Sequence, residues 1–282
     1  MTKVAIVTDS TSYIPKELLD QYPISVAPQV LIWGEQIYED GVDISPSEFY
    51  TRLKSSKINP STSQVTPTSF QKIFARLLEQ DFQVLALLIS ERLSGTIASA
   101  VQALEAFPGA PIEIVNSNST AMALGFQVLS VARAAKEGAS LADCKALAEK
   151  ASQHTGVIFA VDSLEYLHRG GRIGSASRFL GTALNIKPIL ELVDGRVEAV
   201  ERVRTRQKSL ERLLDLAAER IGDRQPVHLA ILHAAAPEDA QMLLELGSKR
   251  FNAVEHIFSE VSPVVGNHTG PGTVGLAFMA GM

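Results

Sequence analysis

The residues with the clearest potential for chemistry are Ser94 and Thr96, whose hydroxyls lie between an apolar run and a helical pattern. The run at 84–89 is short, continuous and rich in branched side chains, which is typical of a strand buried on both faces. Residues 90–99 break this run with Ser and Gly and then resume as a helix. Because helix N–H groups converge beyond such a strand, the pattern predicts an anion site. The alternative is that both hydroxyls only cap the helix.

A second candidate is His268, which lies between glycines in a predicted loop at 266–272. A glycine-rich loop is a poor position for a core histidine, so we expect a hydrogen-bonding role. Ser94 and His268 could serve as nucleophile and base of a hydrolase, but no residue stands out to orient the histidine. The sequence contains neither a G-x-S-x-G elbow nor a P-loop motif.

Arginines form a third candidate group. Arg169, Arg172 and Arg202 belong to an arginine-rich part of a chain that is acidic as a whole. Arginine forms bidentate contacts with carboxylates and phosphates, which favours an anionic partner. The alternative is a solvated surface on which these side chains pair with Glu198 and Glu201.

Composition limits the function classes. The 282-residue chain carries a formal charge of −5, which argues against binding driven by nucleic-acid phosphates. Its single cysteine, Cys144, excludes an intramolecular disulfide, and no Cys/His set has the spacing of a metal site. No apolar run approaches the ~20 residues that a membrane span needs, and no signal peptide precedes the first strand. We therefore expect a cytoplasmic protein without a metal or cofactor.

The elements that must position these residues change character along the chain. Through about residue 155, strand and helix patterns alternate, and clusters of short polar side chains follow the strands. This order predicts a parallel α/β sheet with a site along its carboxyl edge. We expect extended chain at 24–32, a turn at 37–41 and no regular element at 58–64.

The second half mixes strands, helices and a hairpin with an Asp194-Gly195 turn. This mixture predicts an α+β arrangement. We therefore divide the chain into a domain at 1–155 and a domain at 156–282.

Six segments, in this order, resemble the DegV family over essentially the whole chain. They are 7–11, 61–64, 90–96, 167–173, 186–189 and 268–272. The resemblance implies an N-terminal Rossmann-like α/β/α sandwich and a C-terminal α/β layer with a largely antiparallel sheet. It also implies a buried tunnel that holds one long-chain fatty acid, and a carrier without catalytic residues of its own. In some members, a separate dihydroxyacetone-kinase-like subunit transfers phosphate from ATP to the bound carboxylate for phospholipid synthesis.

Carried over by position, the resemblance also implies a set of ligand-binding residues. They are Thr62, Ser63, Ser94, Gly95, Thr96 and His268. Arg169, Arg172 and Arg202 match segments that face the kinase or the transferred phosphate. Asn116 departs from the family pattern, which usually has Asp after this strand.

Several questions stay open at the level of sequence. Two other functions compete with the carrier role. One is a serine esterase or thioesterase, and the other is a regulatory protein that binds another amphipathic carboxylate. Transient membrane contact is compatible with a lipid carrier, and a monomer is the default expectation. Aromatic and Met side chains could line a tunnel or simply fill the core. These are Phe70, Phe74, Phe126, Phe159, Phe179 and Met279.

Overall fold

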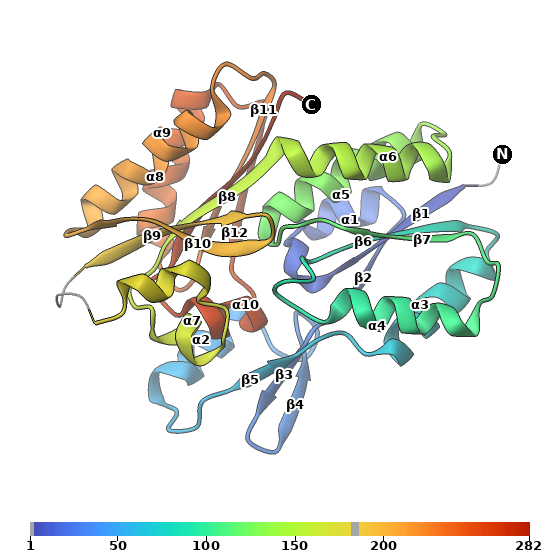
Figure 1. Ribbon diagram of the computed structural model, residues 1–282, viewed down its shortest axis with the longest axis horizontal. Coiled ribbons are helices and arrows are strands. Elements are labelled where there is room, and N and C mark those ends of the chain that lie inside the picture. Colours follow the sequence, from blue (N-terminus) through green and yellow to red (C-terminus); the bar gives the residue numbers. More distant parts are fainter. Residues whose placement is uncertain (1–2, 182–185) are drawn as a thin grey trace.

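The computed structural model describes residues 3–181 and 186–282, which form three β-sheets surrounded by helices (Figure 1). The first sheet is parallel, with the strand order β2-β1-β6-β7. Its strands are β1 (Val4–Asp9), β2 (Ile24–Ala27), β6 (Gln83–Leu88) and β7 (Ile112–Asn116). The helices around it are α1 (Lys16–Gln21), α3 (Pro67–Leu78), α4 (Thr96–Ala103), α5 (Ala121–Lys136) and α6 (Leu141–Ala151). This confirms the predicted Rossmann-like α/β/α sandwich.

Both faces of this sheet are covered by helices. Ile6 and Leu85 point to the layer that contains α5 and α6, whereas Val7 and Ala86 point to the layer of α3 and α4. Figure 1 shows these two layers above and below the sheet. Side chains alternate along a strand, so coverage of both faces requires an apolar residue at every position. The central strands of this sheet, β1 and β6, therefore appear in the sequence largely as continuous apolar runs.

The second sheet has the strand order β10-β9-β8-β13-β11-β12 and is antiparallel except for the β11–β12 pair. Its strands are β8 (Thr155–Ala160), β9 (Lys187–Val193), β10 (Arg196–Val203), β11 (Val227–His233), β12 (Glu255–Glu260) and β13 (Val274–Ala280). Its helices are α7 (Glu165–Arg169), α8 (Arg206–Ile221), α9 (Pro237–Phe251) and α10 (Pro263–Thr269). The largely antiparallel C-terminal sheet was predicted.

Helix α5 lies between the two large sheets. It packs against β1 on one side and against β8 and β13 on the other. A helix enclosed in this way is apolar around most of its circumference, which explains the composition of 121–136. One helix thus packs against both sheets, and the division at 155/156 stays a prediction.

The third sheet is small and joins the two halves of the chain. It contains β3 (Val30–Trp33), β4 (Gln36–Glu39) and β5 (Ser61–Ser63), and helix α2 (Pro46–Ser55) is the neighbouring helix in sequence. Helix α10, from the C-terminal part, contacts α2, β3 and β5. The side chain of Tyr50 on α2 donates a hydrogen bond to Val261 O at 2.9 Å. These contacts fix α10 against the N-terminal half.

Residues 24–32 are extended as expected, but they form two strands in different sheets. Three other local expectations were wrong, because 37–41 contains most of β4, 61–63 is β5, and 266–269 belongs to α10. β5 is only three residues long and pairs with β3, so no periodicity could reveal it. Helix α10 contains two poor helix formers, Gly266 and Asn267, and it is stabilised by packing instead of propensity.

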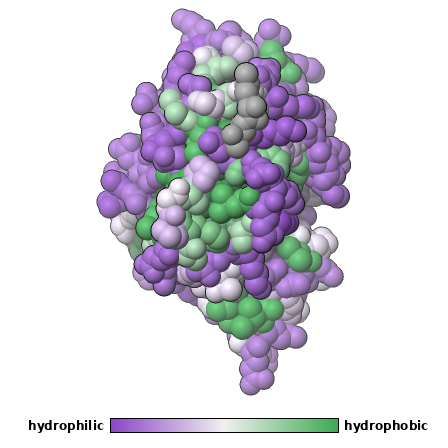
Figure 2. Space-filling view, turned by 90° about the vertical axis from the view of Figure 1, so that its right-hand side faces the viewer, coloured by the Kyte–Doolittle hydropathy of each residue, from purple (hydrophilic) through white to green (hydrophobic). Residues whose placement is uncertain are grey.

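The face of the molecule drawn in Figure 2 is mainly hydrophilic. Figure 2 shows a hydrophobic patch enclosed by hydrophilic side chains, and further hydrophobic side chains toward its lower end. Figure 1 places the β3–β4 hairpin at that end, and Ile37 of this hairpin is 70% exposed. No helix within the described ranges combines the length and apolar character needed to cross a bilayer.

Candidate functional site

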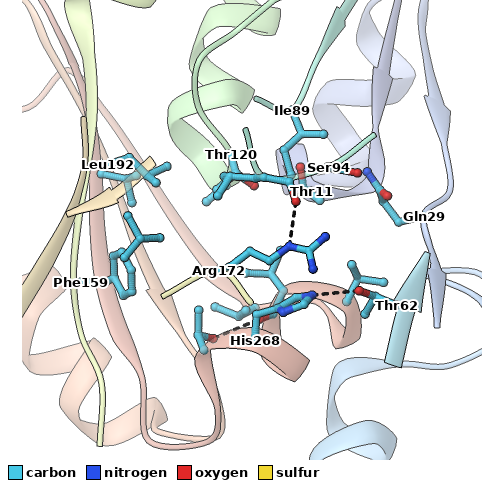
Figure 3. Close-up of a pocket in the computed structure, with 18 of the residues that line it drawn as sticks. Thr11, Gln29, Thr62, Ile89, Ser94, Thr120, Phe159, Arg172, Leu192 and His268 are labelled. Atoms are coloured by element: carbon cyan, nitrogen blue, oxygen red, sulfur yellow. Dashed lines mark hydrogen bonds between the residues drawn. The ribbon is translucent and has the colours of Figure 1, made fainter. Parts of the chain in front are cut away.

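A cavity lies at the carboxyl edge of the parallel sheet, between this sheet, the C-terminal sheet and α10 (Figure 3). It contains about 1000 Å³ of empty space, including its open mouth. Its polar lining residues include Thr11, Gln29, Thr62, Ser63, Gln64, Ser94, Thr120, Arg172 and His268. Its apolar lining residues include Ile89, Leu93, Val157, Phe159, Leu167, Leu192, Val197, Leu232, Val261 and Val264. The cavity therefore combines an apolar wall with a group of hydroxyl, amide, imidazole and guanidinium groups.

The edge of the sheet is held together by Asp9 at the end of β1. Its carboxylate accepts hydrogen bonds from the N–H and hydroxyl of Thr11 and, across to β6, from Ile89 N at 2.7 Å. Burial raises the pKa of Asp9, and these hydrogen bonds, together with one from the Gln29 side chain, oppose the rise. Asp9 thereby fixes the start of the turn that carries Ser94.

Ser94 and Thr96 occupy the predicted turn. Ser94 N donates to Ser90 O at 3.1 Å, and Ser94 lines the cavity. The hydroxyls of Ser94 and Thr96 are 2.9 Å apart, and Thr96 is fully buried behind Ser94. The amide of Gln29 donates to Thr96 Oγ1 at 2.9 Å. Figure 3 shows Gln29 and Ser94 facing each other at the edge of the cavity.

His268 and Thr62 form the second polar group. Their side chains are hydrogen-bonded, with 2.8 Å between Thr62 Oγ1 and His268 Nε2, although 206 positions separate them in the chain. Burial, followed by the charges of Arg172 and Arg169, lowers the pKa of His268 to about 4. The imidazole is therefore neutral at physiological pH.

Arg172 is the only one of the three predicted arginines that lines the cavity. Its Nε donates to Leu93 O at 2.9 Å and its Nη1 to Gly170 O at 2.7 Å. Arg169 instead lies 3.5 Å from Glu165 and stacks on Tyr166. Arg202 stacks on the ring of Phe179, with 5.1 Å to its centroid.

The other predicted positions lie around the cavity in different ways. Ser63 lines it, whereas Gly95 is exposed at the start of α4, beside the side chain of Gln64. Asn116 Oδ1 accepts from Asn118 N at 3.0 Å, so the amide that replaces the usual Asp closes its own turn.

Among the candidate tunnel residues, Phe159 lines the cavity. The other five lie in hydrophobic clusters away from its wall: Phe70, Phe74, Phe126, Phe179 and Met279. Thr11 and Thr120 belong to the polar clusters expected after the strands but were not named as site residues, and Gln29 was missed. Gln29 stands in an extended, mostly apolar stretch that also contains Ser25, and its burial, 2% exposed, became visible only in the fold.

The arrangement differs from a serine hydrolase. Such enzymes need a hydrogen bond between the nucleophile and the base, and a third group that orients the base. Here His268 Nε2 pairs with Thr62, and Ser94 pairs with Thr96. Within the described part of the chain, His268 Nδ1 has no hydrogen-bond partner that could orient the ring. The same residues contain no group of three or more His, Cys, Asp or Glu side chains that could hold a metal ion.

Comparisons with known proteins agree on one family. A family model described as "Uncharacterised protein, DegV family" matches residues 3–281. A DegV domain-containing protein of Streptomyces coelicolor is 38% identical over 97% of both chains. The fatty-acid-binding DegV family protein from Thermus thermophilus is 34% identical, with a TM-score of 0.93 and 99% coverage of both chains. The structure of DegV, a fatty acid binding protein from Bacillus subtilis, is 31% identical, with a TM-score of 0.90 and coverage of 99% and 100%.

Proposed function

The chain belongs to the DegV family, and from this premise and the cavity geometry we propose that it binds one long-chain fatty acid. The carboxylate contacts Thr62, Ser94 and His268, and the acyl chain follows the apolar wall. The observation that carries the proposal is a cavity that places neutral hydrogen-bonding groups and Arg172 beside a largely apolar wall. The fatty-acid binding of two relatives with the same fold supports it.

The apolar wall accounts for affinity. Each buried methylene contributes roughly 0.8 kcal/mol, so about fourteen methylenes supply on the order of 11 kcal/mol before ordering costs. The second domain, residues 156–282, supplies most of the apolar lining and closes over the acyl chain of the ligand.

The polar groups account for the position of the head group. A carboxylate that leaves water must be hydrogen-bonded, and the hydroxyls of Ser94 and Thr62 can do this without a full counter-charge. His268 is neutral above pH about 4 and so also acts as a hydrogen-bonding group. Two N–H groups of Arg172 are already bonded to backbone carbonyls, which limits how tightly it pairs with the ligand. The carboxylate oxygens then keep their nucleophilicity.

The same geometry supports a carrier role. Ser63 and Ser94 are half-buried and Gln64 is exposed, so the head-group end borders solvent. We propose that a separate dihydroxyacetone-kinase-like subunit reaches the carboxylate here. A carboxylate oxygen then forms a bond to the γ-phosphorus of ATP, ADP leaves, and an acyl phosphate results. Arg172, Arg169 and Arg202 would meet the phosphate or the partner.

Lipid extraction combined with substitution of the head-group hydroxyls tests fatty-acid binding. We expect mass spectrometry of a solvent extract from purified protein to find one fatty acid per chain. Ser94→Ala with Thr62→Ala should lower affinity for palmitate at least tenfold, since hydrogen bonds to a charged group contribute about 1.5–3 kcal/mol each. The matched control is Ser61→Ala with Thr68→Ala, which removes two exposed hydroxyls outside the cavity. Equal affinities in the two double variants would contradict the head-group assignment.

Acyl-phosphate trapping tests the carrier role separately. Lipid-loaded protein, Mg-ATP and the kinase-like subunit should together yield an acyl hydroxamate after hydroxylamine treatment. A protein that binds fatty acid but yields no hydroxamate with such a subunit would be a regulatory binding protein and not a carrier.

A further inference from the structure

We propose that Gln29 is a positioning residue that sets the direction of the hydrogen bond between Thr96 and Ser94, so that Ser94 donates its proton to the ligand. This inference rests on the proposed function, because it explains why the cavity would prefer a carboxylate over a neutral head group. Gln29 would not act as a ligand contact in this role. It would act through two hydroxyls.

The chain of contacts is short and buried. Gln29 Nε2 donates to Thr96 Oγ1 at 2.9 Å, and Thr96 Oγ1 lies 2.9 Å from Ser94 Oγ. Thr96 is fully buried and Gln29 is 2% exposed, although Gln29 and Ser94 both line the cavity. Bulk water therefore does not compete for the Thr96 hydroxyl.

The direction of the chain follows from counting donors. A side-chain N–H can only donate, so Thr96 Oγ1 accepts from Gln29. Of the described residues, only Gln29 and Ser94 are hydrogen-bonded to the Thr96 hydroxyl. The Thr96 proton must therefore go to Ser94, because an unpaired buried hydroxyl is destabilising. Ser94 Oγ then accepts from Thr96, and its own proton is directed to the cavity.

The orientation of the Gln29 amide is fixed by its surroundings. Its side chain also hydrogen-bonds Asp9, whose carboxylate accepts from Ile89 N and from Thr11. The nitrogen of the amide, and not its oxygen, lies 2.9 Å from Thr96 Oγ1. The amide therefore donates to Thr96.

The backbone of Gln29 is held just as firmly. Its N–H donates to Ser10 Oγ at 3.1 Å, and its carbonyl accepts from Asp40 N at 2.9 Å. The Ser10 hydroxyl in turn donates to Asp40 Oδ2 at 2.7 Å. With the backbone and the amide both fixed, Gln29 can impose a direction on the hydroxyls instead of adapting to them.

The test compares two head groups on one acyl chain. Dodecanoate can only accept at neutral pH, whereas dodecan-1-ol can accept or donate, so the ratio of their dissociation constants reports the direction of the Ser94 hydroxyl. We expect Gln29→Met to lower the preference for dodecanoate about tenfold and to leave dodecan-1-ol affinity nearly unchanged. In a Thr96→Val background, which removes the relay, Gln29→Met should cause no further change.

The control is Gln127→Met, which removes an equally buried glutamine that bonds to Thr155 and Ser117 outside the cavity. It should lower the melting temperature without changing the head-group ratio. An unchanged ratio in Gln29→Met, or a full additional effect in the Thr96→Val background, would overturn the inference while leaving fatty-acid binding intact. A wild-type protein that binds neither dodecanoate nor palmitate would overturn both proposals.

Discussion

His268 is neutral at physiological pH because it is buried and lies near two positive charges. Burial is the largest cause of its lowered pKa, and Arg172 contributes more than Arg169. Arg172 also connects the Ser94 turn to Gly170, next to the imidazole. One arginine therefore influences both the geometry and the protonation of the head-group end.

Replacement of Arg172 tests this dual role. Arg172→Met should raise the pKa of His268, because a repelling positive charge is lost. It should also lower the free energy of unfolding by about 1.5–3 kcal/mol through the lost hydrogen bonds to two carbonyls. NMR titration of the imidazole and urea unfolding measure the two effects.

Arg169→Met is the matched control for this prediction. Arg169 has a pair with Glu165 on the same helix, and pairs of this kind contribute under about 1 kcal/mol. The Arg169→Met substitution should raise the pKa of His268 by less than the Arg172→Met substitution does. A pKa that does not change in Arg172→Met would show that burial alone keeps the histidine neutral.

Helix α10 is the element on which the site depends most. It is only seven residues long, yet it carries His268 and contacts elements from both halves of the chain. Gly266 allows this close approach, because a Cβ at this position would lie 2.3 Å from Tyr50 Oη. The backbone of α10 at Gly266 therefore packs directly against Tyr50 of α2.

Gly266→Ala should displace α10 from Tyr50. Overpacking of this kind costs about 1–3 kcal/mol, so we expect a lower melting temperature together with weaker fatty-acid binding. Thermal unfolding and palmitate titration on the same sample measure both.

Gly247→Ala on α9 makes the same substitution where a Cβ would meet the flexible ends of Leu229 and Leu214, at 3.1 and 3.4 Å. It should be nearly neutral, because improved helix propensity offsets the closer contact. Equal losses in the two variants would indicate that helix α10 has no special sensitivity to contact with α2.

For the molecule as a whole, two buried groups give opposite dependences of stability on pH. Burial raises the pKa of Asp40 to about 6, although its carboxylate accepts from Ser10 and from Val264 N. Burial also lowers the pKa of His268 to about 4. As pH falls from 6 to about 4, the folded state gains stability through protonation of Asp40. As pH falls from 6.5 to 4, the folded state loses stability through His268. The unfolded chain takes up a proton on this histidine in that range, whereas the folded protein does not.

Each contribution amounts to about 3 kcal/mol across its window, so they largely cancel in the lipid-free protein. Relative to wild type, the free energy of unfolding of His268→Gln should rise as pH falls from 6.5 to 4. Relative to wild type, the free energy of unfolding of Asp40→Asn should fall as pH falls from 6 to 4. Urea unfolding at a series of pH values measures both differences, and profiles parallel to wild type would contradict the assignment.

The sequence by itself determined the elements whose information is local. Apolar runs such as 84–89 and the polar residues after them follow from periodicity and turn chemistry within a few positions. The parallel sheet, its carboxyl-edge site and Ser94 at that edge could therefore be predicted. The glycine-rich loop singled out His268, and the segments matching the DegV family added Thr62 and the antiparallel C-terminal sheet.

Only the tertiary structure decided which polar groups meet. Thr62 and His268 are 206 positions apart, and Gln29 and Thr96 are 67 apart, so no local pattern relates them. β5 exists because β3 offers it hydrogen-bond partners, and α10 exists because Gly266 fits against Tyr50. In the same way, the fold places Arg172 on the cavity wall, whereas Arg169 and Arg202 lie outside it. Hydrogen-bond direction and burial depend on the folded surroundings of a side chain, and a sequence specifies those only through the complete fold.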